Sequence, residues 1–403
     1  MKLNQWTIGL AAAGVVSLGA VMQAEEASHQ VLTALSSTTL SGYVDTSAIW
    51  KFGSGNAPLP GRSYDGVSKQ DGFNLNVVKL TLEKPLDEGE WSAGYRVDLL
   101  FGPDATGYNL SAGTGAVASD FGIKQAYVNF RAPVGNGIDF KLGTFDSLIG
   151  YEVFEAGNNP NYSRSYGWFL EPTQHTGLLA SYRVNDVLSV NAGVANTFNP
   201  GINARAIDAQ TGAASESEKT YMGSVVFTAP ESLGFLHGAT LYAGVVDGFN
   251  ASVNPATTRR DTTSLYVGST IPTPLEGLTF GAAYDYTGYS AQKTVTSSAY
   301  ASAVSGYFSY QVTEKLKLYN RVEYAWSTDG VWYVRGEGAD SDARNQLLGV
   351  TSTLDYSLWA NVISRLEARW DTALTGGQDP VSKPFGNADK SAISLALNLI
   401  YKF

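Results

Sequence analysis

The chain has 403 residues, with 37 acidic and 27 basic side chains and a formal net charge of −10. This acidic balance argues against a nucleic-acid partner, because phosphate binding favours a basic surface. The chain has no cysteine, which excludes disulfides, thiol chemistry and a lipid anchor on cysteine. A composition with 43 Gly, 23 Tyr and 17 Phe and a mean hydropathy of −0.10 is typical of a transmembrane β-barrel, although large soluble β-proteins share it.

The N-terminus has the pattern of a secretory signal peptide. Lys2 precedes an apolar run from Trp6 to Leu18, and small residues follow. A basic start, an apolar stretch of about 7–15 residues and a small-residue cleavage site define such a signal. The run is shorter than the roughly 20 apolar residues that a membrane helix needs. We therefore expect a signal peptide over residues 1–24, a short periplasmic segment over 25–38 and a barrel over 39–403.

Most of the remaining chain consists of segments in which apolar and polar residues alternate. A period of two is the signature of a strand with one apolar face. We count about sixteen such segments, an even number, as is usual for bacterial outer-membrane barrels. The segments are 40–50, 75–83, 91–101, 123–131, 138–145, 177–184, 188–198, 220–228, 240–249, 262–271, 278–289, 300–312, 316–326, 346–356, 361–370 and 391–403.

The connections between these segments alternate in length. Short ones, such as 132–137 and 313–315, are followed by long polar ones, such as 146–174 and 327–345. Tight periplasmic turns and longer external loops produce this alternation in outer-membrane barrels. The sequence therefore predicts one antiparallel transmembrane barrel with its long loops on the outside.

Charged residues of the strands share one face. In the strand that begins at Leu316, Arg321 and Glu323 lie opposite to the apolar Val322. A basic residue facing lipid at mid-membrane costs about 2–4 kcal/mol, so we expect these charges to face the lumen. The candidate pore-wall residues are Arg96, Lys141, Arg321, Glu323, Arg365, Glu367 and Arg369.

The longest connection, Asp146–Pro172, is rich in apolar and aromatic residues such as Phe154 and Trp168. A long loop in a compact domain is usually functional, and these side chains need a surface to pack against. We expect this third external loop to fold into the lumen and narrow it, and an exterior loop packed on its neighbours is the alternative. Its candidate constriction residues are Glu152, Glu155, Arg164 and Glu171.

The final segment, Ser391–Phe403, alternates strictly and ends on an aromatic residue. Ten steps of about 3.4 Å, tilted at about 45°, span roughly 24 Å, which is close to the height of the apolar band of an outer-membrane barrel. This segment resembles the closing strand of bacterial outer-membrane proteins. The resemblance implies that the barrel-assembly machinery is a partner through the strand that ends at Phe403.

Several short motifs lie in and after the third connection. They are Gly150-Tyr151-Glu152, Glu155-Ala156, Asn158-Asn159, Tyr162-Ser163-Arg164-Ser165-Tyr166, Glu171-Pro172 and His175-Thr176-Gly177. The chain from about Leu40 to Phe403 resembles the OmpL-like putative β-barrel porin-2 family through these motifs. The resemblance implies an outer-membrane barrel that serves as a diffusion pore, with no catalytic pattern.

The sequence contains no pattern for catalysis, a metal or a cofactor. The three histidines, His29, His175 and His237, are far apart in the chain. Metal-ligand spacings of the zinc and EF-hand types are missing. His175 could still meet a serine in space, so an outer-membrane hydrolase is a remote alternative. We therefore predict that the chain is not an enzyme.

Together these observations predict a passive porin for small hydrophilic solutes and ions, embedded in outer-membrane lipid. A receptor or adhesin that acts through its external loops is the main alternative. A homotrimer is left open, and the sequence does not name a solute. Because the third connection is the most acidic, we expect a mild cation preference that depends on Glu152 and Glu155.

Overall fold

The computed structural model describes residues 31–32, 37–53, 56–110, 120–198, 201–206, 218–249, 261–290, 298–328, 330–333, 344–375, 384–385 and 389–403. The expected signal peptide and most of the expected periplasmic segment lie outside these residues. The short strand β1 (Val31–Leu32) falls within that segment and pairs with Leu40 and Thr39 at the start of the barrel.

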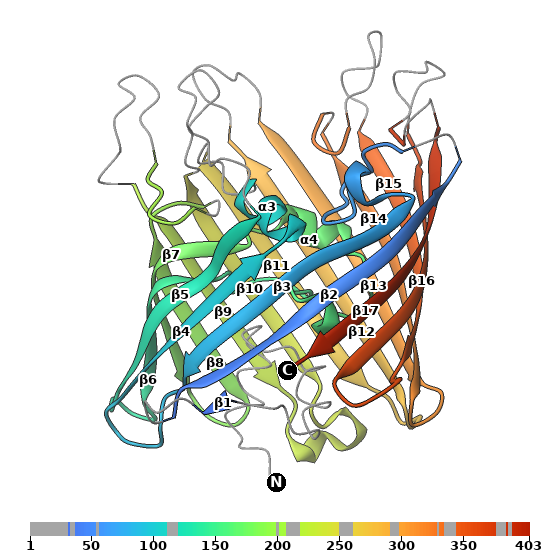
Figure 1. Ribbon diagram of the computed structural model, residues 1–403. Coiled ribbons are helices and arrows are strands. Elements are labelled where there is room, and N and C mark those ends of the chain that lie inside the picture. Colours follow the sequence, from blue (N-terminus) through green and yellow to red (C-terminus); the bar gives the residue numbers. More distant parts are fainter. Residues whose placement is uncertain are drawn as a thin grey trace.

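The described chain forms a closed antiparallel barrel of sixteen strands (Figure 1). Each strand pairs with the next in sequence, and β17 pairs back with β2 from Ile393↔Phe52 to Lys402↔Tyr43. Closure leaves no edge strand with unpaired backbone groups, which a lipid environment requires. The wall strands are β2 (Thr39–Phe52), β3 (Gly72–Lys84), β4 (Ser92–Phe101), β5 (Phe121–Ala132), β6 (Ile138–Asp146), β7 (Gln174–Arg183), β8 (Leu188–Ala195), β9 (Thr220–Thr228), β10 (Thr240–Phe249), β11 (Asp261–Pro272), β12 (Leu278–Tyr289), β13 (Ala299–Gln311), β14 (Leu316–Ser327), β15 (Asn345–Tyr356), β16 (Val362–Ala373) and β17 (Ser391–Lys402).

The prediction of sixteen strands in one barrel is confirmed, and the differences lie at strand ends. The second strand begins at Gly72 rather than Leu75, and the register of β2 against β3 shifts between Asp45 and Thr46. Such a bulge blurs the period of two that defines the strand in sequence. The predicted segment 188–198 is a strand only to Ala195.

The helices lie in connections between strands, where the sequence predicted only loops. Their bounds are η1 (Val67–Lys69), α3 (Pro103–Leu110), η2 (Ala156–Asn158), α4 (Tyr166–Leu170) and η3 (Glu231–Leu236). None of the helices in the described part of the chain is long and apolar enough to cross a membrane.

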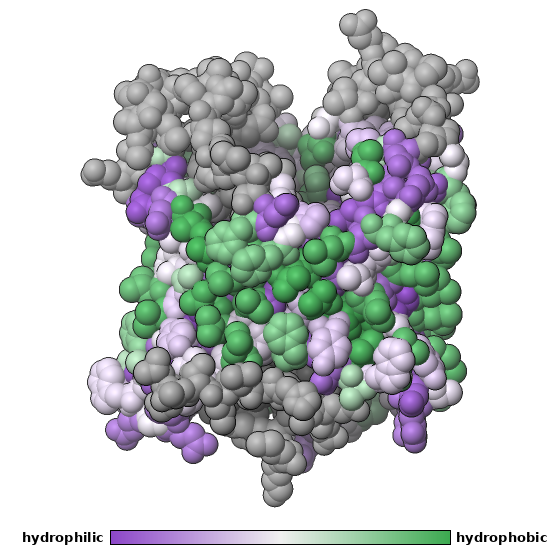
Figure 2. All heavy atoms as spheres, in the orientation of Figure 1, coloured by the Kyte–Doolittle hydropathy of each residue, from purple (hydrophilic) through white to green (hydrophobic). Residues whose placement is uncertain are grey.

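The outer face of the wall carries the apolar residues of the alternating strands. Figure 2 shows hydrophobic side chains gathered around the middle of the visible face, with hydrophilic ones toward both ends. On β17, Leu397 and Leu399 are 46% and 45% exposed, whereas the intervening Asn398 is 3% exposed. The predicted assignment of faces therefore holds for β17, and the charged candidate residues of β14 and β16 are buried on the inner face.

Short and long connections alternate, as predicted. The end of the barrel with short connections, such as 312–315 and 357–361, is called here the short-turn end. The opposite end carries the long connections, including the first (53–71) and the third (147–173). In outer-membrane barrels the short turns face the periplasm.

Candidate pore constriction

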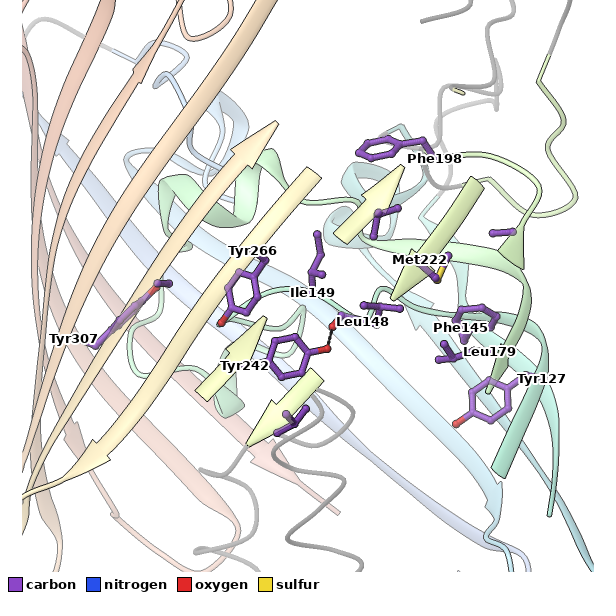
Figure 3. Packing of buried hydrophobic residues seen from close by; sticks show 14 residues of the cluster. Tyr127, Phe145, Leu148, Ile149, Leu179, Phe198, Met222, Tyr242, Tyr266 and Tyr307 are labelled. Carbon is purple, nitrogen blue, oxygen red and sulfur yellow. Dashed lines mark hydrogen bonds between the residues drawn. The ribbon is translucent and has the colours of Figure 1, made fainter. Parts of the chain in front are cut away.

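The third connection begins its course on the inner wall beside β10. Tyr242 donates a hydrogen bond from its hydroxyl to the carbonyl of Leu148, and Ile149 lies against Gly244 (Figure 3). Leu148 and Ile149 belong to one buried cluster with Tyr242, Tyr266 and inward-facing residues of neighbouring strands. The apolar residues at the start of the connection therefore pack on wall strands that carry small and aromatic side chains.

The connection next reaches β12 and β13. Tyr151 stacks on Tyr307 with ring centroids 4.1 Å apart, and its hydroxyl lies where a Cβ of Gly281 would be. The glycine thus leaves the space that the tyrosine occupies. The sequence places Gly281 on the inward face of β12, but only the folded chain shows which side chain fills that space.

Glu152 joins the third connection to a buried chain of alternating charges on the inner wall. Arg321 of β14 contacts Glu152 through Nη1 at 2.8 Å and Glu323 through Nε at 2.8 Å. Arg369 of β16 lies 3.5 Å from Glu323 and 2.9 Å from Asp371.

This chain of charges continues into the first connection. Nη1 of Arg62 lies 2.7 Å from Asp371, and Nε of Arg62 lies 2.6 Å from Asp65. One continuous set of ion pairs therefore fixes the first and third connections to the same side of the lumen, at β14 and β16.

Glu155 joins the third connection to the opposite side of the barrel. Its carboxylate contacts Lys79 of β3 and lies 3.3 Å from Lys124 of β5. Burial alone would raise the pKa of Glu155, but Lys124 and Lys79 lower it to about 2. Because β5 and β14 are separated by seven strand positions in a ring of sixteen, the connection crosses the lumen between Glu152 and Glu155.

The wall around Glu155 continues as a second set of ion pairs. Lys79 lies 3.1 Å from Asp98, and Arg96 lies 3.2 Å from the same carboxylate and 3.3 Å from Glu83. Arg96 remains partly open to the lumen, with 23% of its side chain exposed.

Inward-facing charges of β16 hold the backbone of the third connection. Arg365 donates to the carbonyls of Ala156 at 2.6 Å and Asn159 at 2.9 Å, and Arg369 donates to the carbonyl of Arg164 at 2.6 Å. The carboxylate of Glu367 accepts hydrogen bonds from the backbone amides of Tyr162 and Ser163 at 2.6 and 3.0 Å. An irregular segment cannot pair its own backbone groups, so the wall supplies their partners.

The connection returns to the wall through the short helix α4. Ser165 caps its N-terminus by accepting a bond from the amide of Trp168, and Tyr166 donates from its hydroxyl to Asp371 at 2.6 Å. Near the end of the connection, Glu171 packs close to Asp285 of β12. Burial and the charge of Asp285 raise the pKa of Glu171 well above its usual value, which favours a proton held between the two carboxyl groups.

The first and second connections pack on the third. Tyr64 of the first connection makes an edge contact with Phe154 at 5.2 Å, and the guanidinium of Arg164 lies 5.4 Å from the Tyr64 ring. Tyr108 of α3 also makes an edge contact with Phe154, with ring centroids 5.3 Å apart. The described parts of the three connections therefore form one cluster of aromatic and charged side chains. This cluster lies inside the half of the barrel that carries the long connections (Figure 1).

The predicted site residues come together, but most of them are covered. Arg321, Glu323, Arg365, Glu367 and Arg369 are buried at the contact with the third connection, as are Glu152 and Arg164 of the connection itself. Acids of the third connection and bases of the wall are in direct contact, as at Glu152 and Arg321, instead of lining open water. Arg96, Lys141, Glu155 and Glu171 keep partial exposure.

The sequence reasoning missed several residues of this arrangement. Lys79 and Lys124 are the partners of Glu155, and Arg62 carries the chain of charges into the first connection. Lys79 occupies an inward-facing position in the alternation of its strand, and this position could have identified it as a wall residue. The position of Arg62 in a loop offered no such signal.

Two kinds of catalytic or binding group, a metal-ligand cluster and a hydrolytic triad, can be checked among the described residues. None of their acidic, histidine or cysteine side chains form a group that could hold a metal ion. His175 lies 3.3 Å from the Ser147 hydroxyl, but its other ring nitrogen faces the carbonyl of Thr197 at 3.4 Å. A hydrolytic triad needs a carboxylate where this backbone oxygen lies.

Comparisons with solved structures agree with the barrel fold. No curated protein matches the chain by sequence. Among solved structures, the outer membrane channel DcaP of Acinetobacter baumannii is similar with a TM-score of 0.58 and 13% identity, over 92% of this chain and 99% of that one. OmpT of Vibrio cholerae has a TM-score of 0.55 and 13% identity, over 93% and 100% of the two chains. OprB of Pseudomonas putida has a TM-score of 0.58 and 10% identity, over 91% and 94%.

These structural likenesses concern the fold, and a family profile adds the sequence relationship. The profile described as putative beta-barrel porin-2, OmpL-like, matches residues 37–403, which is nearly the whole chain after the expected signal peptide. The protein therefore belongs to this family of porins and is an outer-membrane porin.

Proposed function

We propose that the protein is a narrow passive channel for small hydrophilic solutes and ions, in which the third connection sets the aperture. The observation that carries this proposal is the attachment of the connection to both sides of the lumen. Glu152 pairs with Arg321 of β14, and Glu155 pairs with Lys79 of β3. A pore narrowed by a fixed polar segment selects solutes by width and by the charges along the passage.

The same attachment supports a path for solutes beside the third connection, along the part of the wall that the connection leaves uncovered. Arg321 and Arg369 are 0% and 1% exposed, so they serve to hold the connection. Arg96 and Lys141, on β4 and β6, stay accessible and are the wall residues that we propose to face the solute. No energy coupling and no catalytic step are part of the proposed mechanism.

Deleting residues 152–166 tests the assignment of the third connection. The deletion removes both charged attachments and most of the segment that crosses the lumen, so single-channel conductance in a planar bilayer should rise severalfold. Circular dichroism and heat-modifiable migration on gels establish that the variant barrel has folded. A folded deletion variant with unchanged conductance would refute the role of the connection as the constriction.

We also propose a homotrimer. One solved structure of OmpT of Vibrio cholerae, a protein with the same fold, is of a trimer form. Native mass spectrometry of the detergent-solubilised protein should show three copies, and a monomer at all detergent concentrations would contradict this assembly. The barrel-assembly machinery and outer-membrane lipid remain expected partners.

A further inference from the structure

Three lysines of the inner wall take no part in either set of ion pairs. Their places in the strand register put them inside the barrel. Lys141 pairs with Asn129 and Leu179, Lys317 pairs with Asp355, and Lys402 pairs with Tyr43. All three side chains are partly exposed.

The contacts of these lysines are with neutral groups. The ammonium of Lys141 lies 5.0 Å from the Tyr127 ring centroid, and that of Lys317 lies 4.9 Å from the Tyr319 ring centroid. Lys402 donates to the amide oxygen of Asn158 at 3.2 Å. In the described part of the chain, no carboxylate lies within ion-pair distance of any of the three.

Acidic side chains of the surrounding wall are paired with other cations. Asp355, the register partner of Lys317, lies 2.8 Å from Nε of Arg365. Glu83 and Asp146 on the wall near Lys141 pair with Arg96 and Lys124. The three ammonium groups are therefore available to a mobile anion.

The lysines also lie in the same half of the barrel. Lys141 is the fourth residue of β6, Lys317 is the second of β14, and Lys402 is the last of β17, so all lie toward the short-turn end. Toward the long-connection end of the barrel, Glu171 and Asp285 lie together, and the proton held between them leaves the pair with one negative charge. Neither carboxyl group forms an ion pair with a described cation.

We propose that Lys141, Lys317 and Lys402 make the short-turn vestibule a binding region for small anions with phosphate or carboxylate groups, and that the resulting axial charge asymmetry makes the channel rectify. This inference rests on the proposed channel function and names the charges that select within it. Charges that line a passage with low-dielectric walls raise the local concentration of counter-ions. Salt screens this field over about 8–10 Å near physiological ionic strength and over about 3 Å at 1 M.

Current–voltage curves of single channels test the proposal. At about 0.1 M KCl the currents at opposite voltages should differ by about twofold, and the difference should vanish near 1 M because of screening. The triple variant Lys141→Gln, Lys317→Gln, Lys402→Gln should conduct with symmetric currents. Inorganic phosphate should reduce the current of the unaltered protein from one side only.

A matched control variant removes three positive charges, the same number as the lumen variant, at positions outside the lumen. Lys84 points outward by register, whereas Lys315 and Lys390 are exposed residues of connections, in a short turn and in the long connection before β17. Their triple replacement by Gln should keep the rectification. Loss of rectification in this variant, or its persistence in the lumen variant, would overturn the assignment of the three lysines.

A second measurement separates this inference from the channel function. Line broadening of phosphorus-31 NMR signals of inorganic phosphate reports binding to the detergent-solubilised protein without any current. Broadening that is lost in the lumen variant supports the anion region, and equal broadening in both overturns it. A protein that binds phosphate but carries no current would refute the channel function alone.

Discussion

At the scale of single residues, two glutamates three positions apart attach one segment to two sides of a barrel. Glu152 faces Arg321 of β14, and Glu155 faces Lys79 and Lys124 of β3 and β5. Both carboxylates are largely withdrawn from water, so each depends on its cations. Removing one partner of a buried ion pair leaves an uncompensated charge, which typically costs about 3–5 kcal/mol.

The lowered pKa of Glu155 makes the attachment dependent on pH. A carboxyl whose pKa falls on folding stabilises the folded arrangement above its unfolded pKa of 4.5, and this contribution is lost as pH falls toward about 2. Conductance fluctuations should therefore be constant from pH 7 to about 5 and should grow below about pH 4. Glu155→Gln should show large fluctuations already at pH 7, whereas Glu314→Gln, in an exposed turn, should match the unaltered protein. Quiet Glu155→Gln channels at pH 7 would contradict this role.

At the scale of elements, wall strands and the third connection are fitted to each other. The wall provides arginines and Glu367 as partners for backbone groups of a connection that is largely irregular. Glycines on the inward face provide space for the side chains of the connection, as at Gly281 beneath Tyr151. The connection is consequently held by backbone bonds, ion pairs and close packing together.

Replacing Gly281 by alanine tests the packing contribution. A Cβ at this position overlaps the Tyr151 hydroxyl, and overpacking of this kind costs about 1–3 kcal/mol. The variant should unfold at a lower temperature and show a changed conductance. Gly306→Ala on the neighbouring strand is the matched control, since its nearest atoms are at 3.9 and 4.0 Å. Equal melting temperatures for the two variants would show that the space beneath Tyr151 is not needed.

At the scale of the whole molecule, closure of the barrel depends on the last residues. Phe403 exchanges backbone hydrogen bonds with Gly42 at 2.9 and 3.0 Å, just beyond the β17–β2 pairing. These bonds do not involve the aromatic ring. The ring of Phe403 can therefore be removed without removing the hydrogen bonds that end the seam.

The Phe403→Ala variant distinguishes the role of the last residues in closing the barrel from a role in recognition by the assembly machinery of the cell. If the terminal aromatic is read by the assembly machinery, the amount of folded protein in outer membranes should fall severalfold. Refolding of the purified variant in detergent should remain close to that of the unaltered chain, because the backbone pairing is kept. Normal membrane levels, or an equal loss in detergent, would contradict a recognition role.

The sequence by itself determined the barrel. Alternation in sixteen segments and the lengths of the connections are local properties, and the cost of charge in lipid allows only one assignment of faces. The alternation alone places each residue of β16 and β17 on the inner or the outer face. The predicted start of β3 was inexact because a bulge interrupts the alternation there, and this bulge depends on the pairing with the neighbouring strand β2.

Only the tertiary structure decided what the inward charges do. Arg321, Arg365 and Arg369 face the lumen as the alternation predicts, yet they bind the third connection instead of water. Arg62 and Asp371 are 309 positions apart in the chain and meet at 2.7 Å. The physical reason is that the alternation of apolar and polar residues is a local property that specifies which face of a strand a residue occupies. The partner of a buried charge depends on how an irregular loop folds over long range, and such a loop has no repeating pattern in its sequence.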